Sequence, residues 1–316
     1  MSRERTPATF VAPFRRRVRE RAPTPHTHTP STKAVSAELI YDVGMHNGDD
    51  TAFYLRQGYR VLAIEANPQL AEKARGRFQQ EIRDGRLQIL NVGIAAEDGE
   101  REFWISHRYS DWSSFDRAVA SRDGGECHAI VVPTRRFGGI VAEHGVPMYL
   151  KIDIEGSDVL CVGDLQRGRL PQYVSLESEC GNATEADEWF RPLRLLADLG
   201  YRRFKLIDQR TLAPLSYPPN VELLTDYVAA RAAALLPRPA GVSRVLRRVR
   251  LREQLYRKHG WRFSDGCSGP WGNDTPGRWM TAAEAERTYE FFRRRHFRRA
   301  RARAYGIWWD WHAALD

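Results

Sequence analysis

The sequence has few cysteines and none of the motifs that cysteines form in zinc proteins or disulfide-rich proteins. Its four cysteines, Cys127, Cys161, Cys180 and Cys267, lie far apart, and no two of them form a CxxC pair. This spacing predicts neither a zinc site nor a disulfide framework. We therefore expect reduced thiols and a cytoplasmic protein.

Long apolar runs are also missing. No stretch approaches the roughly 18 uncharged apolar residues of a transmembrane helix, and no apolar signal-peptide core follows the basic N-terminus. We therefore expect no transmembrane segment. With 316 residues, of which 42% are hydrophobic, the chain is long enough for one large α/β domain and an appendage.

Charge is unevenly distributed along the chain. Counting Lys and Arg against Asp and Glu, residues 1–36 carry +6, residues 37–230 carry −8 and residues 231–316 carry +11. Basic ends suit contact with nucleic acid, an anionic membrane surface or an acidic glycan, and the alternative is a solvated arginine face. We expect peripheral contact with anionic surfaces at most, and no specific nucleic-acid partner.

The same three segments differ in pattern. Residues 1–36 are rich in Pro, Thr and Arg without an apolar period, which predicts disorder. Over residues 37–230, strand patterns alternate with helix patterns, which predicts a doubly wound, mostly parallel α/β sheet. Residues 231–316 lack this alternation, and their pattern predicts a basic, aromatic-rich helical extension. Within it, Thr281 and Glu284 form a candidate capping box.

The most informative stretch follows the first predicted strand. Asp42 ends the strand, Gly44 and Gly48 follow, and Asp49 and Asp50 begin the next helix. Glycines at such a turn let the backbone approach a ligand closely. The third glycine of the dinucleotide motif is missing, and two carboxylates at the helix start would repel a pyrophosphate. The stretch therefore favours S-adenosylmethionine, which has a positively charged end, over NAD.

A second acid lies where a cofactor ribose is usually bound. Glu65 follows the second predicted strand, 23 residues after Asp42. A carboxylate there can accept hydrogen bonds from two ribose hydroxyls, in NAD as well as in S-adenosylmethionine. Glu65 alone does not distinguish the two cofactors.

Four segments together resemble the FkbM family of S-adenosylmethionine-dependent methyltransferases. They are residues 42–49 (DVGMHNGD), 63–68 (AIEANP), 149–156 (YLKIDIEG) and 174–177 (VSLE). The resemblance implies a class I methyltransferase fold, Rossmann-like with seven strands. It also implies methyl transfer to a hydroxyl oxygen of a sugar, glycolipid or related natural product. The family usually has Ala-Asn where this chain has Met45 and His46.

The chemistry of methyl transfer suggests three catalytic candidates. Asp153 ends the fourth strand of the predicted parallel sheet, beside the expected methyl position, and Glu155 follows two residues later. Either could hold the cofactor's amino group, bind a cation or accept the hydroxyl proton. His46 is a third candidate base, with a hydrogen-bonded loop histidine as the alternative. Asp153, Glu177 and Glu179 offer oxygen ligands for Mg²⁺, but their spacing is only suggestive and we assign no metal ligand.

We expect the cofactor to be held by residues from the strand ends and from one connecting loop. Asn91 ends the third strand, where adenine is the expected neighbour, and the resemblance implies a serine pair near the cofactor. The predicted cofactor-binding residues are Asp42, Gly44, His46, Gly48, Asp49, Thr51, Glu65, Asn67, Asn91, Ser113, Ser114 and Asp153.

Two alternatives differ in class from an O-methyltransferase acting on a small-molecule or glycan acceptor. A binding or scaffold protein could keep the fold without catalysis, although Asp42, Glu65 and Asp153 are all present. An NAD-dependent oxidoreductase is disfavoured by Asp49 and Asp50. The region of Trp271 and Trp279 suggests an acceptor lid or, alternatively, packing of the C-terminal helix on the domain.

Overall fold

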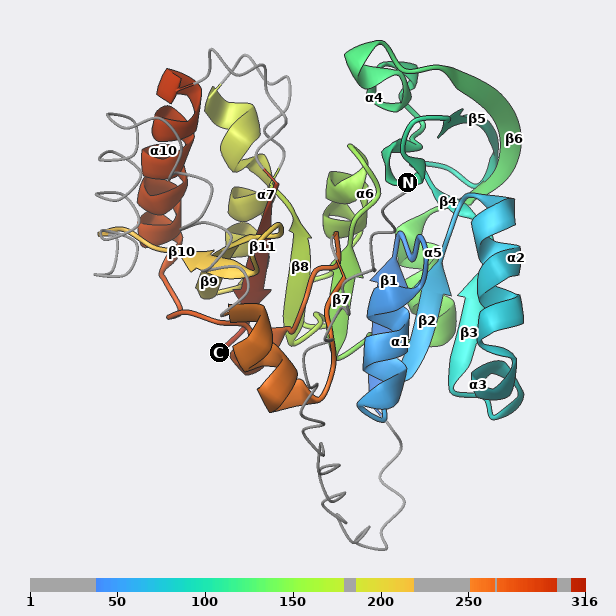
Figure 1. Cartoon of the computed structure of the whole chain (residues 1–316), viewed down its shortest axis with the longest axis horizontal. Coiled ribbons are helices and arrows are strands. Elements are labelled where there is room, and N and C mark those ends of the chain that lie inside the picture. The colour runs from blue at the N-terminus through green and yellow to red at the C-terminus, as the bar shows by residue number, and fades with distance from the viewer. Residues whose placement is uncertain (1–37, 179–185, 219–250, 265, 300–307) are drawn as a thin grey trace, which may run out of the picture. The chain divides into compact units, whose positions relative to one another are not determined.

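The computed structural model describes residues 38–178, 186–218, 251–264, 266–299 and 308–316 (Figure 1). The predicted disorder of residues 1–36, the first part of the predicted C-terminal helical extension, Glu179 and Cys180 lie outside these residues. Among the described residues, no helix is long and apolar enough to cross a membrane.

A central sheet of eight strands carries the fold, in the order β10-β9-β11-β8-β7-β1-β2-β3. Strands β1, β2, β3, β7 and β8 are parallel to one another. β11 runs antiparallel between β8 and β9, and β10 forms an antiparallel edge on β9. The strands are β1 (Leu39–Val43), β2 (Arg60–Ile64), β3 (Leu87–Leu90), β7 (Tyr149–Ile152), β8 (Tyr173–Glu177), β9 (Arg203–Asp208), β10 (Ala213–Leu215) and β11 (Trp309–Ala314).

This sheet confirms the predicted class I methyltransferase architecture, with eight strands instead of seven. A second sheet, in the order β4-β6-β5, is inserted between β3 and β7. Its strands are β4 (Gly93–Ile94), β5 (Gly99–Ser106) and β6 (Cys127–Arg135). Between β5 and β6 lie the short helices η1 (Ser110–Trp112), α4 (Arg117–Ala120) and η2 (Arg122–Gly124).

Helices cover both faces of the central sheet, and each face has its own apolar core. One face packs on α5 (Phe137–His144), α6 (Asp158–Gly163), α7 (Ala186–Leu199) and α10 (Ala282–Arg299). The other packs on α1 (Asp49–Arg56), α2 (Pro68–Arg77) and residues 251–264 and 266–267, of which residues 251–259 are helical. The remaining elements are α3 (Gln79–Arg83) and η3 (Gly272–Asp274).

Local sequence explains where two of these helices begin. Asn67 caps α2 by accepting a hydrogen bond from the Gln69 N–H at 3.0 Å, and Pro68 occupies the first helical position. At α10, Thr281 and Glu284 form the predicted capping box: the Thr281 N–H donates to Glu284 Oε2, and the Glu284 N–H donates to Thr281 Oγ1.

The C-terminal strand β11 corrects the predicted organisation of residues 231–316. These residues are not a purely helical appendage, because β11 pairs with β8 and β9 inside the central sheet (Figure 1). Its sequence alternates, with Trp309, Trp311 and Ala313 in one apolar core and Asp310 and His312 on the opposite face. This two-residue period was the available signal for a strand.

We predict that Trp311→Ala lowers the free energy of unfolding by about 3–5 kcal/mol, the usual loss for a buried large aromatic residue. Trp311 is fully buried and packs on Tyr289 with ring centroids 5.4 Å apart. Urea unfolding followed by circular dichroism measures the change. Val131→Ala is the control, since Val131 is 65% exposed and its loss should change stability by less than about 0.5 kcal/mol. Equal effects of the two substitutions would contradict a central position for β11.

Candidate functional site

A cavity opens at the carboxyl ends of β1, β2 and β7, the position at which open α/β sheets bind ligands. It encloses about 980 Å³ of empty space, part of which is open to solvent. The inserted sheet and the C-terminal segment contribute walls as well. Among the residues that line it are Gly44, His46, Asp49, Asp50, Glu65, Ile94, Phe103, Ser110, Asp111, Ser113, Phe115, Lys151, Asp153, Glu155, Ser264, Gly266 and Cys267.

Gly44 lets the loop after β1 pass against the end of β7. Its φ of 81° lies in the left-handed region, and a Cβ placed there would come within 1.9 Å of the Asp153 carbonyl oxygen. The Gly44 carbonyl in turn accepts a hydrogen bond from Lys151 Nζ at 2.7 Å. Glycine is therefore required both by the backbone conformation and by the close approach.

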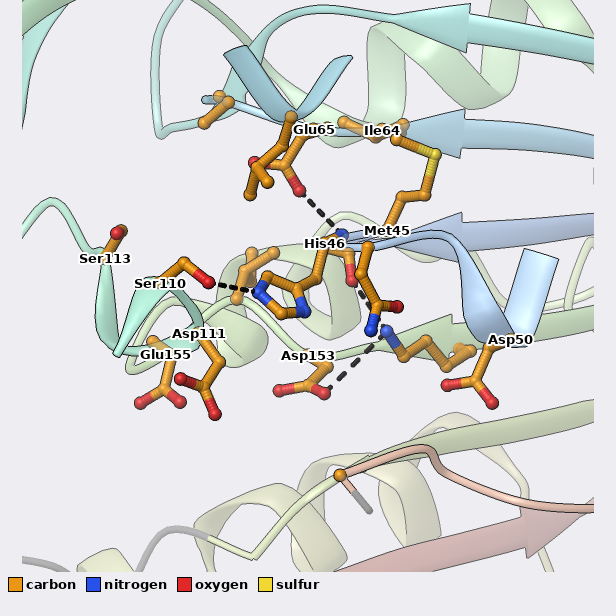
Figure 2. Close-up of a pocket in the computed structure, with 18 of the residues that line it drawn as sticks. Met45, His46, Asp50, Ile64, Glu65, Ser110, Asp111, Ser113, Asp153 and Glu155 are labelled. Carbon is orange, nitrogen blue, oxygen red and sulfur yellow. Dashed lines mark hydrogen bonds and ion pairs between the residues drawn. The ribbon is translucent and has the colours of Figure 1, made fainter. Parts of the chain in front are cut away.

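Glu65 is fixed at one side of the cavity by two backbone N–H groups. His46 N donates to Glu65 Oε2 at 2.8 Å (Figure 2). Asn67 N donates to Glu65 Oε1, also at 2.8 Å. Burial raises the pKa of Glu65 to about 7, although both hydrogen bonds act in the opposite direction. Asn91 holds the same turn from behind, since its side-chain amide donates to the Glu65 carbonyl at 2.8 Å.

His46 connects this loop to the inserted sheet. Its Nε2 lies 2.7 Å from Ser110 Oγ, and its ring lies between the labelled side chains of Glu65 and Asp153 in Figure 2. Burial lowers the pKa of His46, while nearby carboxylates, Asp111 foremost, raise it in part. Because the net shift is downward, the imidazole is neutral at pH 7. The hydrogen bond to Ser110 fits the loop-histidine alternative and leaves the role of base unassigned.

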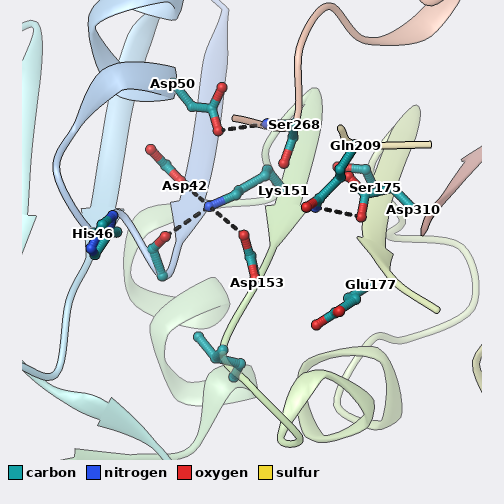
Figure 3. Close-up of polar contacts among 12 residues, drawn as sticks. Asp42, His46, Asp50, Lys151, Asp153, Ser175, Glu177, Gln209, Ser268 and Asp310 are labelled. Atoms are coloured by element: carbon teal, nitrogen blue, oxygen red, sulfur yellow. Dashed lines mark hydrogen bonds and ion pairs between the residues drawn. The ribbon is translucent and has the colours of Figure 1, made fainter. Parts of the chain in front are cut away.

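Lys151 is a buried cation at the floor of the cavity. Its Nζ lies 3.1 Å from Asp42 Oδ1 and 3.7 Å from Asp153 Oδ2 (Figure 3). Burial alone would lower the pKa of Lys151, but Asp42, Asp153 and Asp50 outweigh it and raise the pKa above its usual value. The ammonium therefore stays charged and ties the ends of β1 and β7 together.

Several of the predicted cofactor-binding residues do not line the cavity. Asp42 is completely buried, where it accepts a hydrogen bond from Thr51 Oγ1 at 2.6 Å and pairs with Lys151. Ser114 Oγ donates to the Glu155 carbonyl at 2.9 Å, and a Cβ on Gly48 would meet the ring of Phe78 at 2.7 Å. The predicted residues that do not line the cavity are Asp42, Gly48, Thr51, Asn67, Asn91 and Ser114. They support the loops that do line it.

The other predicted residues lie at the cavity wall. They are Gly44, His46, Asp49, Glu65, Ser113, Asp153 and Glu155. Burial raises the pKa of Asp153 and raises that of Glu155 to about 8, although Glu155 Oε2 lies 3.0 Å from Arg122 Nη2.

The C-terminal segment forms a wall that the sequence did not predict. Ser264 Oγ donates to Asp49 Oδ2 at 2.7 Å, and Ser268 N donates to Asp50 Oδ2 at 3.0 Å. Burial raises the pKa of Asp49, but hydrogen bonds from Ser264 and Arg77 outweigh it and lower the pKa below its usual value. Burial raises the pKa of Asp50 to about 7. The two acids at the start of α1 therefore line the cavity and also accept hydrogen bonds from the C-terminal segment.

The tryptophans proposed as a lid are packed within the fold. Trp271 stacks on Tyr149 with centroids 4.8 Å apart and an interplanar angle of 16°. Lys205 Nζ lies 4.2 Å from the centroid of the Trp279 ring. Neither tryptophan lines the cavity, which agrees with the packing alternative.

Several lining residues escaped the sequence analysis because nothing nearby in the sequence marks them. Phe103 reaches the cavity from β5, and Ser110 and Phe115 reach it from the connection between β5 and β6. Gly266 comes from the C-terminal part of the chain. Lys151 belongs to the segment 149–156, which resembles the FkbM family. A lysine on an otherwise apolar strand, two residues before Asp153, was the available signal that it is buried with an acidic partner.

Comparison with known proteins identifies a family. Residues 42–203 match the methyltransferase FkbM domain family. Among solved structures, the chain is similar to precorrin-6y C5,15-methyltransferase from Geobacter metallireducens GS-15, with 12% identity, a TM-score of 0.31 and coverage of 54% of this chain and 66% of that one. No curated protein matches the sequence.

A second similar structure is the O-methyltransferase from a trans-AT PKS multienzyme of Brevibacillus brevis, in complex with S-adenosyl-L-homocysteine. It has 14% identity and a TM-score of 0.29, and the match covers 72% of this chain and 64% of that one. This chain thus spans slightly less than two thirds of the length of either structure.

We predict that Lys151→Met lowers the free energy of unfolding by about 3–5 kcal/mol, because it leaves Asp42 buried without its cation. Arg135→Met is the control, since it removes the exposed pair with Glu143 and should cost less than about 1 kcal/mol. Urea unfolding compares the two variants. Adding Asp42→Asn to Lys151→Met should cost less than the sum of the single changes, and strict additivity would contradict the pair.

Proposed function

Because the chain belongs to the FkbM methyltransferase family, we propose that it transfers a methyl group from S-adenosylmethionine to a hydroxyl oxygen of a small-molecule or glycan acceptor. The observation that carries the proposal is the placement of Glu65 and Asp153 in one cavity, at the carboxyl ends of β2 and β7, the two parallel strands that flank β1. Glu65 suits a ribose and Asp153 suits a positively charged reacting centre.

The residues of the cavity fit S-adenosylmethionine in charge and shape. Asp50 lines the cavity, and its Oδ1 is buried with no hydrogen-bond partner in the described part of the chain, which suits an ammonium group. Both Glu65 oxygens already accept one N–H bond each and keep a further lone pair for ribose hydroxyls. Apolar side chains among the lining residues suit the flat adenine, for example those of Leu70, Val92, Ile94, Phe103 and Phe115.

When bound, S-adenosylmethionine supplies a methyl group carried on a positively charged sulfur. The acceptor oxygen bonds to the methyl carbon as the carbon–sulfur bond breaks, and the hydroxyl proton must pass to a base. Asp153 is the proposed proton acceptor, because it ends β7 at the cavity wall. Glu155, held by Arg122, completes that side of the site.

The rim of the cavity supports a carbohydrate acceptor. Tyr109 is 49% exposed and adjoins Ser110 and Asp111, which line the cavity. Trp112 lies beside it, with ring centroids 4.7 Å apart. The exposed Tyr109 ring suits the apolar face of a sugar ring, whereas the Trp112 ring is half-buried and packs against the Arg122 guanidinium. Radiolabelled methyl transfer into the host's glycan and lipid extracts identifies the acceptor, and incorporation only into protein or nucleic acid would contradict a glycan or small-molecule substrate.

We predict that Glu65→Ala weakens S-adenosylhomocysteine binding tenfold or more, since hydrogen bonds to charged groups contribute about 1.5–3 kcal/mol each. Isothermal titration calorimetry measures the affinity. Glu72→Ala is the control because the Glu72 side chain is 76% exposed, and its affinity should equal that of the wild type. Wild-type protein that binds NAD tightly but not S-adenosylhomocysteine would overturn the proposed function.

Once an acceptor is known, Asp153→Asn should lower kcat by about 10²- to 10⁴-fold, the usual contribution of a positioned base. Affinity for S-adenosylhomocysteine, measured in parallel, separates this loss from a loss of cofactor binding. Asp84→Asn, at an exposed position at the end of α3, should keep full turnover. Full activity of Asp153→Asn would remove Asp153 from the reaction.

A further inference from the structure

The register of the central sheet places three carboxylates in one row. Glu177 on β8 is directly opposite Asp310 on β11. On the other side, Lys151 on β7 is opposite Ser175, so Asp153 lies beside Glu177 two residues further along. Paired residues project to the same face of a sheet. Asp153, Glu177 and Asp310 therefore share the face that carries Lys151 (Figure 3).

Glu155 joins this row to form a compact group of oxygen donors. One carboxylate oxygen from each of Asp153, Glu155 and Glu177 lies within 4.8 Å of the other two. Oxygens bound to one divalent ion at about 2.0–2.6 Å are at most about 4–5 Å apart. The spacing thus matches ligands that surround a single ion.

Asp310 provides a second, independent observation that indicates a ligand beside this group of carboxylates. It is 2% exposed, and Gln209 Nε2 donates to its Oδ1 at 2.7 Å. Its Oδ2 is buried and has no hydrogen-bond partner within the described ranges. Because Asp310 opposes Glu177 across an antiparallel pair, its side chain is directed toward the same group. A buried carboxylate oxygen left in this state is costly unless a positive group satisfies it.

The neighbouring cations leave part of this negative charge unbalanced. Lys151 lies 3.7 Å from Asp153 but also pairs with Asp42, and Arg122 pairs with Glu155. Across the residues that the structure describes, Glu177 and Asp310 have no Lys or Arg partner within 4.0 Å. A doubly charged ion would balance these two groups.

We propose that Asp153, Glu155 and Glu177 bind a hard divalent cation of the Mg²⁺ or Mn²⁺ type, with Asp310 as a further acidic neighbour. All the donors are carboxylate oxygens, which suit these ions rather than zinc or copper. This inference rests on the proposed function, because Asp153 faces the cavity in which the acceptor hydroxyl is expected. An ion there orients the hydroxyl oxygen and eases loss of its proton.

Calorimetric titration of the chelator-treated full chain with Mn²⁺ tests the site. Wild-type protein should bind one ion, and Glu177→Gln and Asp310→Asn should each weaken binding at least tenfold. Asp310→Asn keeps an oxygen for the Gln209 contact and serves as the second variant if Glu177→Gln fails to fold. Glu143→Gln is the control, since its side chain is 55% exposed on α5 and its affinity should match the wild type.

Titration of the same samples with S-adenosylhomocysteine separates the two proposals. Wild-type protein that binds S-adenosylhomocysteine but no Mn²⁺ overturns the metal site and leaves the proposed function intact. Equal Mn²⁺ affinity in wild type, Glu177→Gln and Asp310→Asn also overturns it, because the ion would then bind elsewhere. Failure of the wild type to bind S-adenosylhomocysteine counts against the proposed function itself.

Discussion

The site depends on one buried ammonium group. Lys151 joins the Asp42 carboxylate, the Gly44 carbonyl and the Asp153 carboxylate at distances of 2.7–3.7 Å. These partners belong to the ends of two neighbouring parallel strands and to the turn that follows the first. Burial of an unpaired charge is strongly unfavourable, so Lys151 can be buried only if its acidic partners are buried beside it. The geometry of the cavity floor follows from that requirement.

The two faces of the central sheet differ in what they contribute: one is packed with apolar residues, and the other carries polar residues near the site. Strand residues on one face are apolar and pack on α5, α6, α7 and α10. Near the carboxyl ends, the other face carries a row that runs from Asp42 through Lys151, Ser175 and His312 to Lys205, each opposite the next in register. Most members of this row have polar partners: Asp42 pairs with Lys151, Ser175 bonds the Tyr149 hydroxyl, and Lys205 donates to the Gly272 and Thr275 carbonyls. β11, at the C-terminal end of the chain, contributes His312 to this row, between Ser175 of β8 and Lys205 of β9.

The sequence predicted the sheet and the edge of the site well, because polar residues that end apolar strands stand out. Glu65 and Asp153 lie at the cavity as expected, whereas Asp42 points into the interior. The difference is one of position along the strand: Asp42 lies within β1, whereas Glu65 and Asp153 directly follow β2 and β7. Ser110, Ser264 and Gly266 reach the cavity through tertiary packing, for which the local sequence contains no period or cap. The strand β11 was missed although its alternation was visible.

The concentration of acids around a single lysine limits what the cavity can bind. Asp49, Asp50, Asp153 and Glu155 all line it, and Lys151 is the cation among its lining residues. A pyrophosphate would bring two further negative charges against the start of α1, where Asp49 and Asp50 already occupy the favourable end of the helix dipole. A sulfonium and an ammonium bring the opposite charge, and Asp50 has an unpaired oxygen to receive one. The same acids that made the first turn atypical of a dinucleotide site thus determine its preference for a positively charged cofactor.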